Sequence, residues 1–167
     1  IVNGVRYDDS AATVLDEDEG SHSHDVLKLG MMVEVDGAQI DHARALGKAL
    51  RIRFGSAIVG PVNSVAAAAG TLVVLGQTVE TKPTTVFDDN LPGGLAALTA
   101  GTVVEVHALF DASTGHYVAT RIEGKPDAAF YKLRGVIANL DTTAKTFTMG
   151  GEVINYGSLI VADLPHA

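Results

Sequence analysis

The sequence contains no cysteine and no tryptophan, and aromatic residues make up only 5% of it. The absence of cysteine excludes a disulfide framework, thiol chemistry and cysteine-based zinc sites. The low aromatic content leaves few platforms on which a base or a sugar ring could stack. Besides phenylalanine, the only aromatic side chains are those of Tyr7, Tyr117, Tyr131 and Tyr156.

Positive charge and long apolar runs are also scarce. Twelve lysines and arginines stand against 20 aspartates and glutamates, which gives a formal net charge of −8. Such a chain repels a phosphate backbone and offers little counterion release, so we expect no nucleic-acid partner. No stretch approaches the roughly 18 consecutive apolar residues of a membrane-spanning helix, and we expect no membrane span in this chain.

The usual catalytic signatures are missing as well. The sequence has no Gly-x-Ser-x-Gly elbow, no Gly-x-x-x-x-Gly-Lys phosphate loop and no Gly-x-Gly-x-x-Gly stretch. His107 lies within a valine-rich run and His116 follows a turn, which is typical of strand and rim positions. We therefore predict that the protein is not an enzyme and has no resident cofactor.

The apolar content, 47%, is carried by Val, Leu, Ile and Ala, and 18 glycines separate short valine-rich runs. Aliphatic packing on pleated surfaces with glycine-containing turns is typical of a many-stranded fold, so the expected class is all-β.

The chain repeats itself at a spacing of 71 to 75 residues. Repeats at such spacing indicate recurring structural units. The matching segments are 30–35 (GMMVEV) with 101–106 (GTVVEV), 60–65 (GPVNSV) with 135–140 (GVIANL), and 71–76 (TLVVLG) with 146–151 (TFTMGG).

These matches divide the chain into residues 1–55, 56–124 and 125–167. Only 56–124 is a complete unit, with strands expected at 57–62, 71–75, 77–81, 84–87, 102–109 and 116–122 and a helical turn at 95–98. Residues 7–9 (YDD) align with 87–89 (FDD), so that 1–55 lacks its first hairpin, whereas 125–167 lacks its last. Because exposed strand edges invite pairing, the last unit is expected to complete the first one, within the chain or across a protomer boundary.

The strand and turn residues at 135–151, together with Gly-x-x-Val-Glu-Val and 119–123 (ATRIE), resemble the bacterial family called domain of unknown function 5666. The resemblance implies tandem OB-like barrels of five to six strands, each with a short helical turn, in exported or envelope-associated proteins. It implies a periplasmic or extracellular location and transfers no catalytic residues.

The densest polar cluster is residues 16–25 (DEDEGSHSHD). In an extended segment His22 and His24 fall on one side, so both could reach one divalent ion with Asp18 or Asp25 completing its shell. The alternative is a solvated acidic loop. A calcium loop of the EF-hand type is excluded, because Gly20 and Leu27 stand where ligands are needed.

Two further sets of residues are candidates for contacts. Tyr117 and the Gly93-Gly94 loop could form the mouth of an oligosaccharide-binding barrel. Glu34 and Glu105 hold equivalent places, as do Arg51 and Arg121, and we expect cross-strand Glu–Arg pairs in the two units.

The sequence thus predicts a non-catalytic binding or structural module of an exported bacterial envelope protein, with an unidentified protein or glycan partner and self-association through open strand edges. The alternatives are an oligosaccharide-binding barrel and a protein that binds a divalent metal weakly through its acidic loop.

Overall fold

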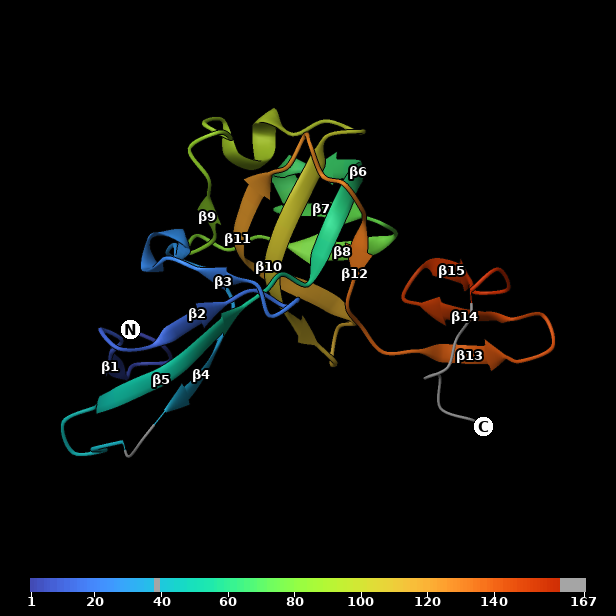
Figure 1. Cartoon of the computed structure of the whole chain (residues 1–167). Coiled ribbons are helices and arrows are strands. Elements are labelled where there is room, and N and C mark those ends of the chain that lie inside the picture. The colour runs from blue at the N-terminus through green and yellow to red at the C-terminus, as the bar shows by residue number, and fades with distance from the viewer. Residues whose placement is uncertain (38–39, 160–167) are drawn as a thin grey trace.

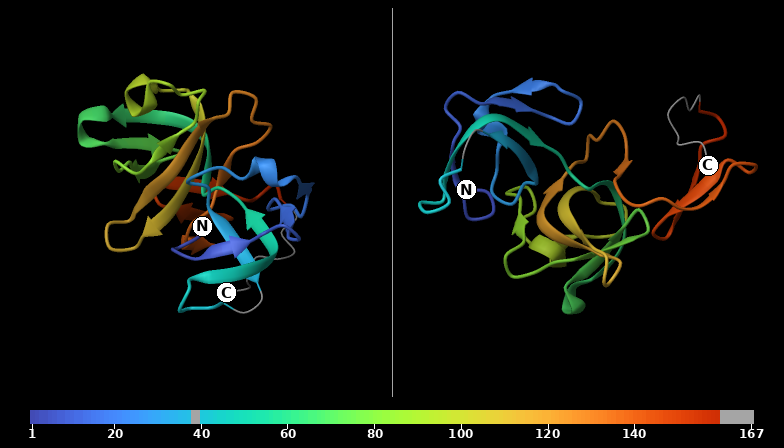
Figure 2. Two further views of the ribbon diagram at one scale, coloured as in Figure 1. Left: turned by 90° about the vertical axis from the view of Figure 1, so that its left-hand side faces the viewer. Right: turned by 90° about the horizontal axis from the view of Figure 1, so that it is seen from below.

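A computed structural model describes residues 1–37 and 40–159 and shows an all-β protein, as predicted (Figure 1). The helical segments in these residues are three short 3-10 turns, none of which could span a bilayer. The strands form three sheets, and the central one closes into a barrel. Seen from below, the barrel lies between the N-terminal and C-terminal sheets (Figure 2).

The barrel contains five strands in the order β6-β7-β8-β11-β10, and β10 pairs with β6 to close it. All neighbouring strands are antiparallel except β8 and β11, which are parallel. Short strands β9 and β12 extend it by pairing with β11 and β6. The strands are β6 (Ile58–Ala66), β7 (Thr71–Val74), β8 (Gln77–Glu80), β9 (Val86–Phe87), β10 (Val103–Asp111), β11 (His116–Gly124) and β12 (Lys132–Leu133).

Aliphatic side chains at alternate strand positions fill the barrel, and fully buried examples are Ile58, Val74, Val104 and Ile122. The strands expected within residues 56–124 and the helical turn, η3 (Gly94–Ala97), are present. Pro61 directly precedes a β-bulge in β6, a position that suits a residue without a backbone N–H.

The N-terminal sheet contains β1 (Arg6–Asp8), β2 (Thr13–Leu15), β3 (Ser21–His22), β4 (Val33–Gly37) and β5 (Leu46–Phe54). The long strand β5 is its centre: β4 pairs with it antiparallel, and β1 and β2 pair with it in parallel. A small core of its own forms around Val14, Ala49 and Ile52. Unlike the central sheet, this sheet does not close.

The pairings around β5 match those around β11 residue by residue. Val35 faces Ile52 as Val106 faces Ile122. In both ladders one further pair follows, Asp36–Arg51 or His107–Arg121, and a β-bulge comes directly after it. On the parallel side β1 and β2 stand where β8 and β9 stand in the barrel.

This register corrects the alignment of Tyr7 with Phe87. Tyr7 pairs with Gly47 as Val79 pairs with Tyr117, which makes Val79 the counterpart of Tyr7. The short Tyr-Asp-Asp match misled because two aspartates after an aromatic residue are a weak signal. Among the described residues, the N-terminal sheet therefore lacks counterparts of the barrel strands β6 and β7.

The C-terminal sheet contains β13 (Ala138–Asp141), β14 (Thr146–Met149) and β15 (Glu152–Asn155). These strands pair only with one another in the part of the chain that the structure describes, so they do not complete the N-terminal sheet of their own chain. Instead, the Gln77 side chain of the barrel donates a hydrogen bond to the Met149 carbonyl (2.7 Å).

Candidate functional site

The best-defined polar site lies where the N-terminal sheet meets the barrel, around the link at residues 55–57 between β5 and β6. We call this region the seam. Glu17 lies at its centre, with one carboxylate oxygen 2.5 Å from Arg134 and the other 2.5 Å from Lys132. Gly55 leaves the space for Glu17, because a Cβ atom there would overlap its carboxylate.

Arg121 forms a buried ionic network on the barrel side of the seam. Its side chain is 6% exposed and contacts the carboxylates of Asp88 and Glu123. It also donates a hydrogen bond to the Leu29 carbonyl of the N-terminal sheet's connecting loop (3.2 Å). One guanidinium therefore pairs with two carboxylates, of which Glu123 also contacts Lys125 (3.4 Å), and ties the two sheets together.

The backbones of the two sheets approach closely at Gly30. This residue has φ of +86°, and a Cβ atom on it would lie 2.6 Å from the Thr120 carbonyl oxygen. Only glycine meets both requirements without strain. Gly101, the sequence-equivalent glycine, has φ of +89°, but a Cβ atom on it would meet nothing within 4 Å, so its constraint is conformational alone.

His107 is a further buried polar group at the seam, with 1% exposure. Its Nδ1 lies 3.0 Å from the Gly55 carbonyl oxygen and 3.3 Å from the Met32 backbone nitrogen, and the tautomer decides which hydrogen bond forms. Its Nε2 has no hydrogen-bond partner among the described residues, and Glu105 lies 3.9 Å away. Burial lowers the pKa of His107, although the Glu105 carboxylate opposes this effect.

The lowered pKa of His107 predicts that acid destabilises the fold. Below about pH 6.5, the ordinary pKa of histidine, the unfolded chain takes up a proton that the folded chain resists. The free energy of unfolding should therefore fall as the pH drops from about 6.5 toward the lower pKa of the folded state. His107→Gln should flatten this decline in urea titrations, whereas His42→Gln, at an exposed position, should retain it. Equal slopes in both variants would contradict the assignment.

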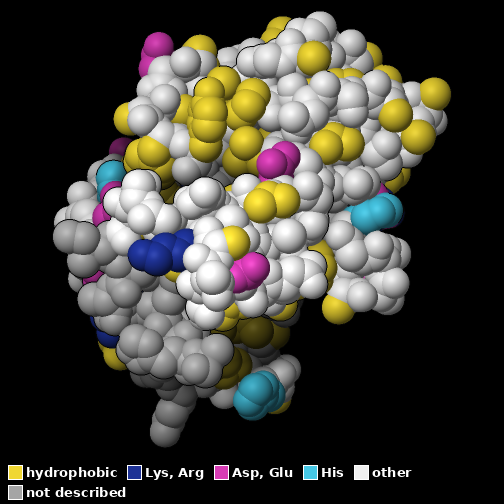
Figure 3. All heavy atoms as spheres, turned by 90° about the vertical axis from the view of Figure 1, so that its right-hand side faces the viewer, with side chains coloured by type: hydrophobic (Ala, Val, Ile, Leu, Met, Phe, Trp, Pro, Cys, Tyr) yellow, Lys and Arg dark blue, Asp and Glu magenta, His cyan; other side chains and the backbone are white. Residues whose placement is uncertain are grey.

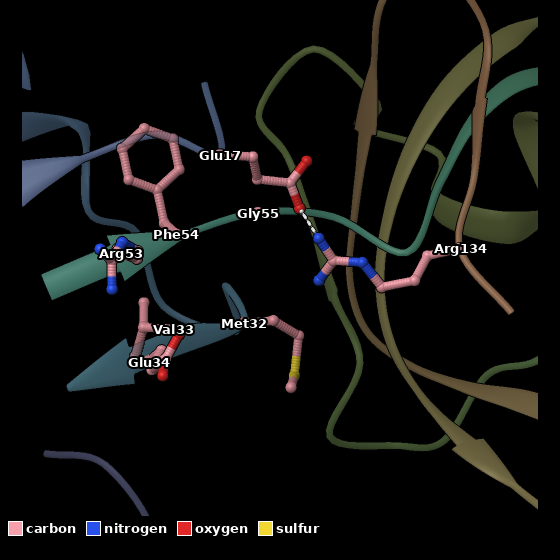
Figure 4. Close-up of a pocket in the computed structure, with 8 residues that line it drawn as sticks. All are labelled: Glu17, Met32, Val33, Glu34, Arg53, Phe54, Gly55 and Arg134. Atoms are coloured by element: carbon pink, nitrogen blue, oxygen red, sulfur yellow. Dashed lines mark hydrogen bonds and ion pairs between the residues drawn. The ribbon is translucent and has the colours of Figure 1, made fainter. Parts of the chain in front are cut away.

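A cleft of about 320 Å³ opens at the seam (Figure 4). Arg53 and Arg134 lie on opposite sides of it, with Phe54 and Met32 supplying apolar surface. Both guanidinium groups are already paired, Arg134 with Glu17 and Arg53 with Glu19 and Asp36. The charges in the cleft are thus mostly satisfied internally, which suits a structural junction better than an anion site.

The structure does not bring the predicted metal ligands together. His22 turns to Asp16, with 2.7 Å between Nε2 and Oδ2, and this hydrogen bond lowers the pKa of Asp16. His24 instead contacts the Asp9 carbonyl oxygen (2.9 Å). Asp25 hydrogen-bonds with Ser23, and the Asp18 backbone donates to Asp16.

Within residues 1–37 and 40–159, no group of three or more His, Cys, Asp or Glu side chains is arranged to hold a metal ion. Metal binding by the acidic loop stays a prediction that the geometry does not strengthen.

The predicted sugar contacts are also separated. Tyr117 is 3% exposed, packs in the barrel core, and donates its hydroxyl to the Arg134 carbonyl. Gly94 packs near Phe87, whose ladder partner Ile122 lies five residues along β11 from Tyr117. At about 3.3 Å per strand residue, Ile122 lies roughly 17 Å from Tyr117 along β11. Gly93 directly precedes Gly94 at the start of η3, so the structure places both glycines beside Phe87 and not beside Tyr117.

The prediction that Glu34 and Glu105 pair with Arg51 and Arg121 is wrong, because these arginines bind other carboxylates. Arg51 pairs with Asp36 (2.9 Å), and Arg121 pairs with Asp88 and Glu123. Glu105 faces Glu123 across its ladder and binds Lys125 (2.9 Å) instead. Burial raises the pKa of Glu105, but the hydrogen bond and charge of Lys125 lower it by more, so the pKa of Glu105 lies below its usual value.

Sequence reasoning missed Glu17, which it placed in a charged loop, and the seam role of His107. The only signal for the site was the recurrence of arginine at positions 51 and 121.

The fold and the seam define an all-β protein with a closed five-stranded barrel and a second sheet tied to it through buried polar contacts. The chain belongs to the family described as domain of unknown function (DUF5666), whose model matches residues 1–45 and 59–123. No curated protein and no solved structure shows a significant match to it.

Proposed function

We propose that this chain is a non-catalytic structural module of an exported bacterial envelope protein, in which successive β units are held in a fixed arrangement. The observation that carries the proposal is that Arg121 connects the barrel to the N-terminal sheet. A buried guanidinium that pairs with two carboxylates of its own barrel also donates to Leu29 of the neighbouring sheet. Its exported, envelope location rests on the resemblance to the family.

The other polar groups of the seam also connect separate segments of the chain. Glu17 connects the acidic loop to Lys132 and Arg134, and His107 lies against Gly55 and Met32. Catalytic groups are usually left partly unpaired and open to substrate. Here the charged groups hold pieces of the chain together, which favours a scaffold over an enzyme.

A binding role for the barrel is the second candidate. The closed barrel of five strands, with β8 parallel to β11, supports the OB-like arrangement that the family resemblance implies. OB-type barrels bind oligosaccharides or oligonucleotides on the face of their second and third strands. The corresponding strands β7 and β8 carry no aromatic residue. A glycan array with the whole chain tests this role, and specific binding would favour it over the scaffold.

A fixed seam is testable by distance measurement, because the cysteine-free chain accepts specific spin labels. One label replaces the exposed Arg44 in the N-terminal sheet and the other replaces the exposed Ser113 in the β10–β11 turn. We expect double electron–electron resonance, on labelled chain diluted into an excess of unlabelled chain, to give one narrow distance distribution. A broad distribution in the unmodified seam would overturn the proposal.

Two matched variants connect the distribution to the seam. Glu17→Gln removes the charge between Lys132 and Arg134, and should broaden the distribution. Glu19→Gln removes a carboxylate that pairs with Arg53 inside the N-terminal sheet, and should leave the distribution unchanged.

A further inference from the structure

The N-terminal sheet has an open side. Among the described residues β4 pairs only with β5, so its other edge has no ladder partner. A cavity of about 360 Å³ lies against this sheet, lined by residues of β1, β4, β5 and the loop before β4, and its apolar side chains include Val33, Val35 and Ile52. In the closed barrel β6 occupies the corresponding place beside β10.

The matching registers specify which residues would fill this place. In the barrel, Val104 faces Gly60 and Val103 faces Pro61. Val33 and Met32 are the counterparts of Val104 and Val103 in the GxxVEV repeat. The counterparts of Gly60 and Pro61 in the second repeat are Gly135 and Val136.

Residues 135–137 are free to make such a pairing. They lie between β12 and β13 and belong to no ladder. Val136 is 73% exposed, and Ile137 is 42% exposed although its barrel equivalent, Val62, is buried. Figure 3 views the side from which the C-terminal sheet protrudes, and hydrophobic side chains form several patches on it.

The direction of the chain after β12 prevents residues 134–137 from pairing in this register with the N-terminal sheet of their own chain. Strand β12 runs toward the seam, because Lys132 faces Val59, Leu133 faces Ile58, and Arg134 donates to the Ala57 carbonyl. Strand β4 starts at the seam and runs away from it. The chain leaving Arg134 would therefore run parallel to β4, whereas the register of β6 and β10 is antiparallel.

We infer that residues 134–137 of a second copy pair antiparallel with the free edge of β4, and that its β13–β15 sheet covers the cavity. Charge complementarity supports this occupant. The register places Arg134 of the second copy opposite Glu34, and its side chain is 66% exposed although it also pairs with Glu17 of its own chain. Cross-strand pairs of opposite charge are favourable. The donated segment, residues 134–155, is comparable to the roughly 20–30 residues per side of a stable interface.

The donor and acceptor surfaces differ, so the contact is head to tail. Copies either exchange segments reciprocally in a dimer or associate into a chain. The inference extends the proposed scaffold role, because it makes the same β units the means of assembly.

Cysteine cross-linking tests the register directly. Facing residues in antiparallel strands have Cα atoms about 4.5–5.5 Å apart, within disulfide range. Met32→Cys and Val136→Cys are prepared separately as full chains, mixed, and oxidised. We expect a disulfide between the two variants, identified by mass spectrometry, together with concentration-dependent association of the unmodified chain in sedimentation velocity.

The controls separate specific pairing from random collision. Ser113→Cys mixed with Val136→Cys should cross-link at only the background rate. Ile137→Pro removes the N–H that would bind the Met31 carbonyl, and should weaken association about tenfold. Equal cross-linking in test and control mixtures, or a monomer at every concentration, would overturn the inference. A narrow spin-label distribution in the same protein would still leave the proposed scaffold role intact.

Discussion

Replacing Arg121 with methionine should lower the free energy of unfolding by about 3–5 kcal/mol, the usual cost of removing one partner from a buried ionic network. The side chain is 6% exposed, and its removal would leave the carboxylates of Asp88 and Glu123 without their shared cation. The Leu29 carbonyl would also lose a hydrogen-bond donor. Urea denaturation followed by circular dichroism measures the change.

Arg51→Met is the matched control, because Arg51 is the counterpart of Arg121 in the N-terminal sheet. Its side chain is 45% exposed and pairs with Asp36. Exposed ion pairs contribute about 0–1 kcal/mol, so this variant should remain close to the parent. Similar losses for both variants would show that burial of the Arg121 network adds nothing to stability.

The second large effect is expected at Gly30. Alanine there should cost about 1–2 kcal/mol for its positive φ, and about 1–3 kcal/mol more for overpacking against the neighbouring backbone. The contact responsible is the Thr120 carbonyl oxygen, 2.6 Å from the position of the new Cβ. The seam would have to open to relieve it, so the spin-label distribution should also broaden.

Gly101→Ala isolates the packing contribution. Gly101 has nearly the same φ as Gly30 but open space around its Cβ position, so only the conformational cost applies. Its free energy of unfolding should fall by about 1–2 kcal/mol and its seam should remain fixed. If the two variants lost the same stability, the close approach at Gly30 would be without consequence.

The local pattern of residues 56–124 was enough to place the strands of the barrel. Alternating valines and the glycines that separate the valine-rich runs are local signals, and the strands appear where expected. The Glu–Arg pairs failed because a repeat shows which residues are equivalent and not which neighbour each one meets. Arg121 meets Asp88 from a separate segment, and no spacing within the hairpin reveals it.

The candidate site was harder to predict. Glu17 and Arg134 are 117 residues apart and meet only because the acidic loop and the segment after β12 reach the same seam. Tyr117 shows the reverse error: a tyrosine near a turn suggested an exposed ring, but strand alternation directs it into the core. The prediction for His22 and His24 did not anticipate their hydrogen-bond partners. His22 bonds to Asp16 and His24 to the Asp9 carbonyl, so the two rings do not share a ligand.

Composition, strand alternation and short-range turns are enough to predict an all-β chain with an aliphatic core and to recognise its family. Which sheet closes, which edge stays open and which charged groups are buried together became visible in the folded chain alone. Those outcomes depend on contacts between segments distant in sequence, whose energies arise from burial and geometry that no local pattern encodes.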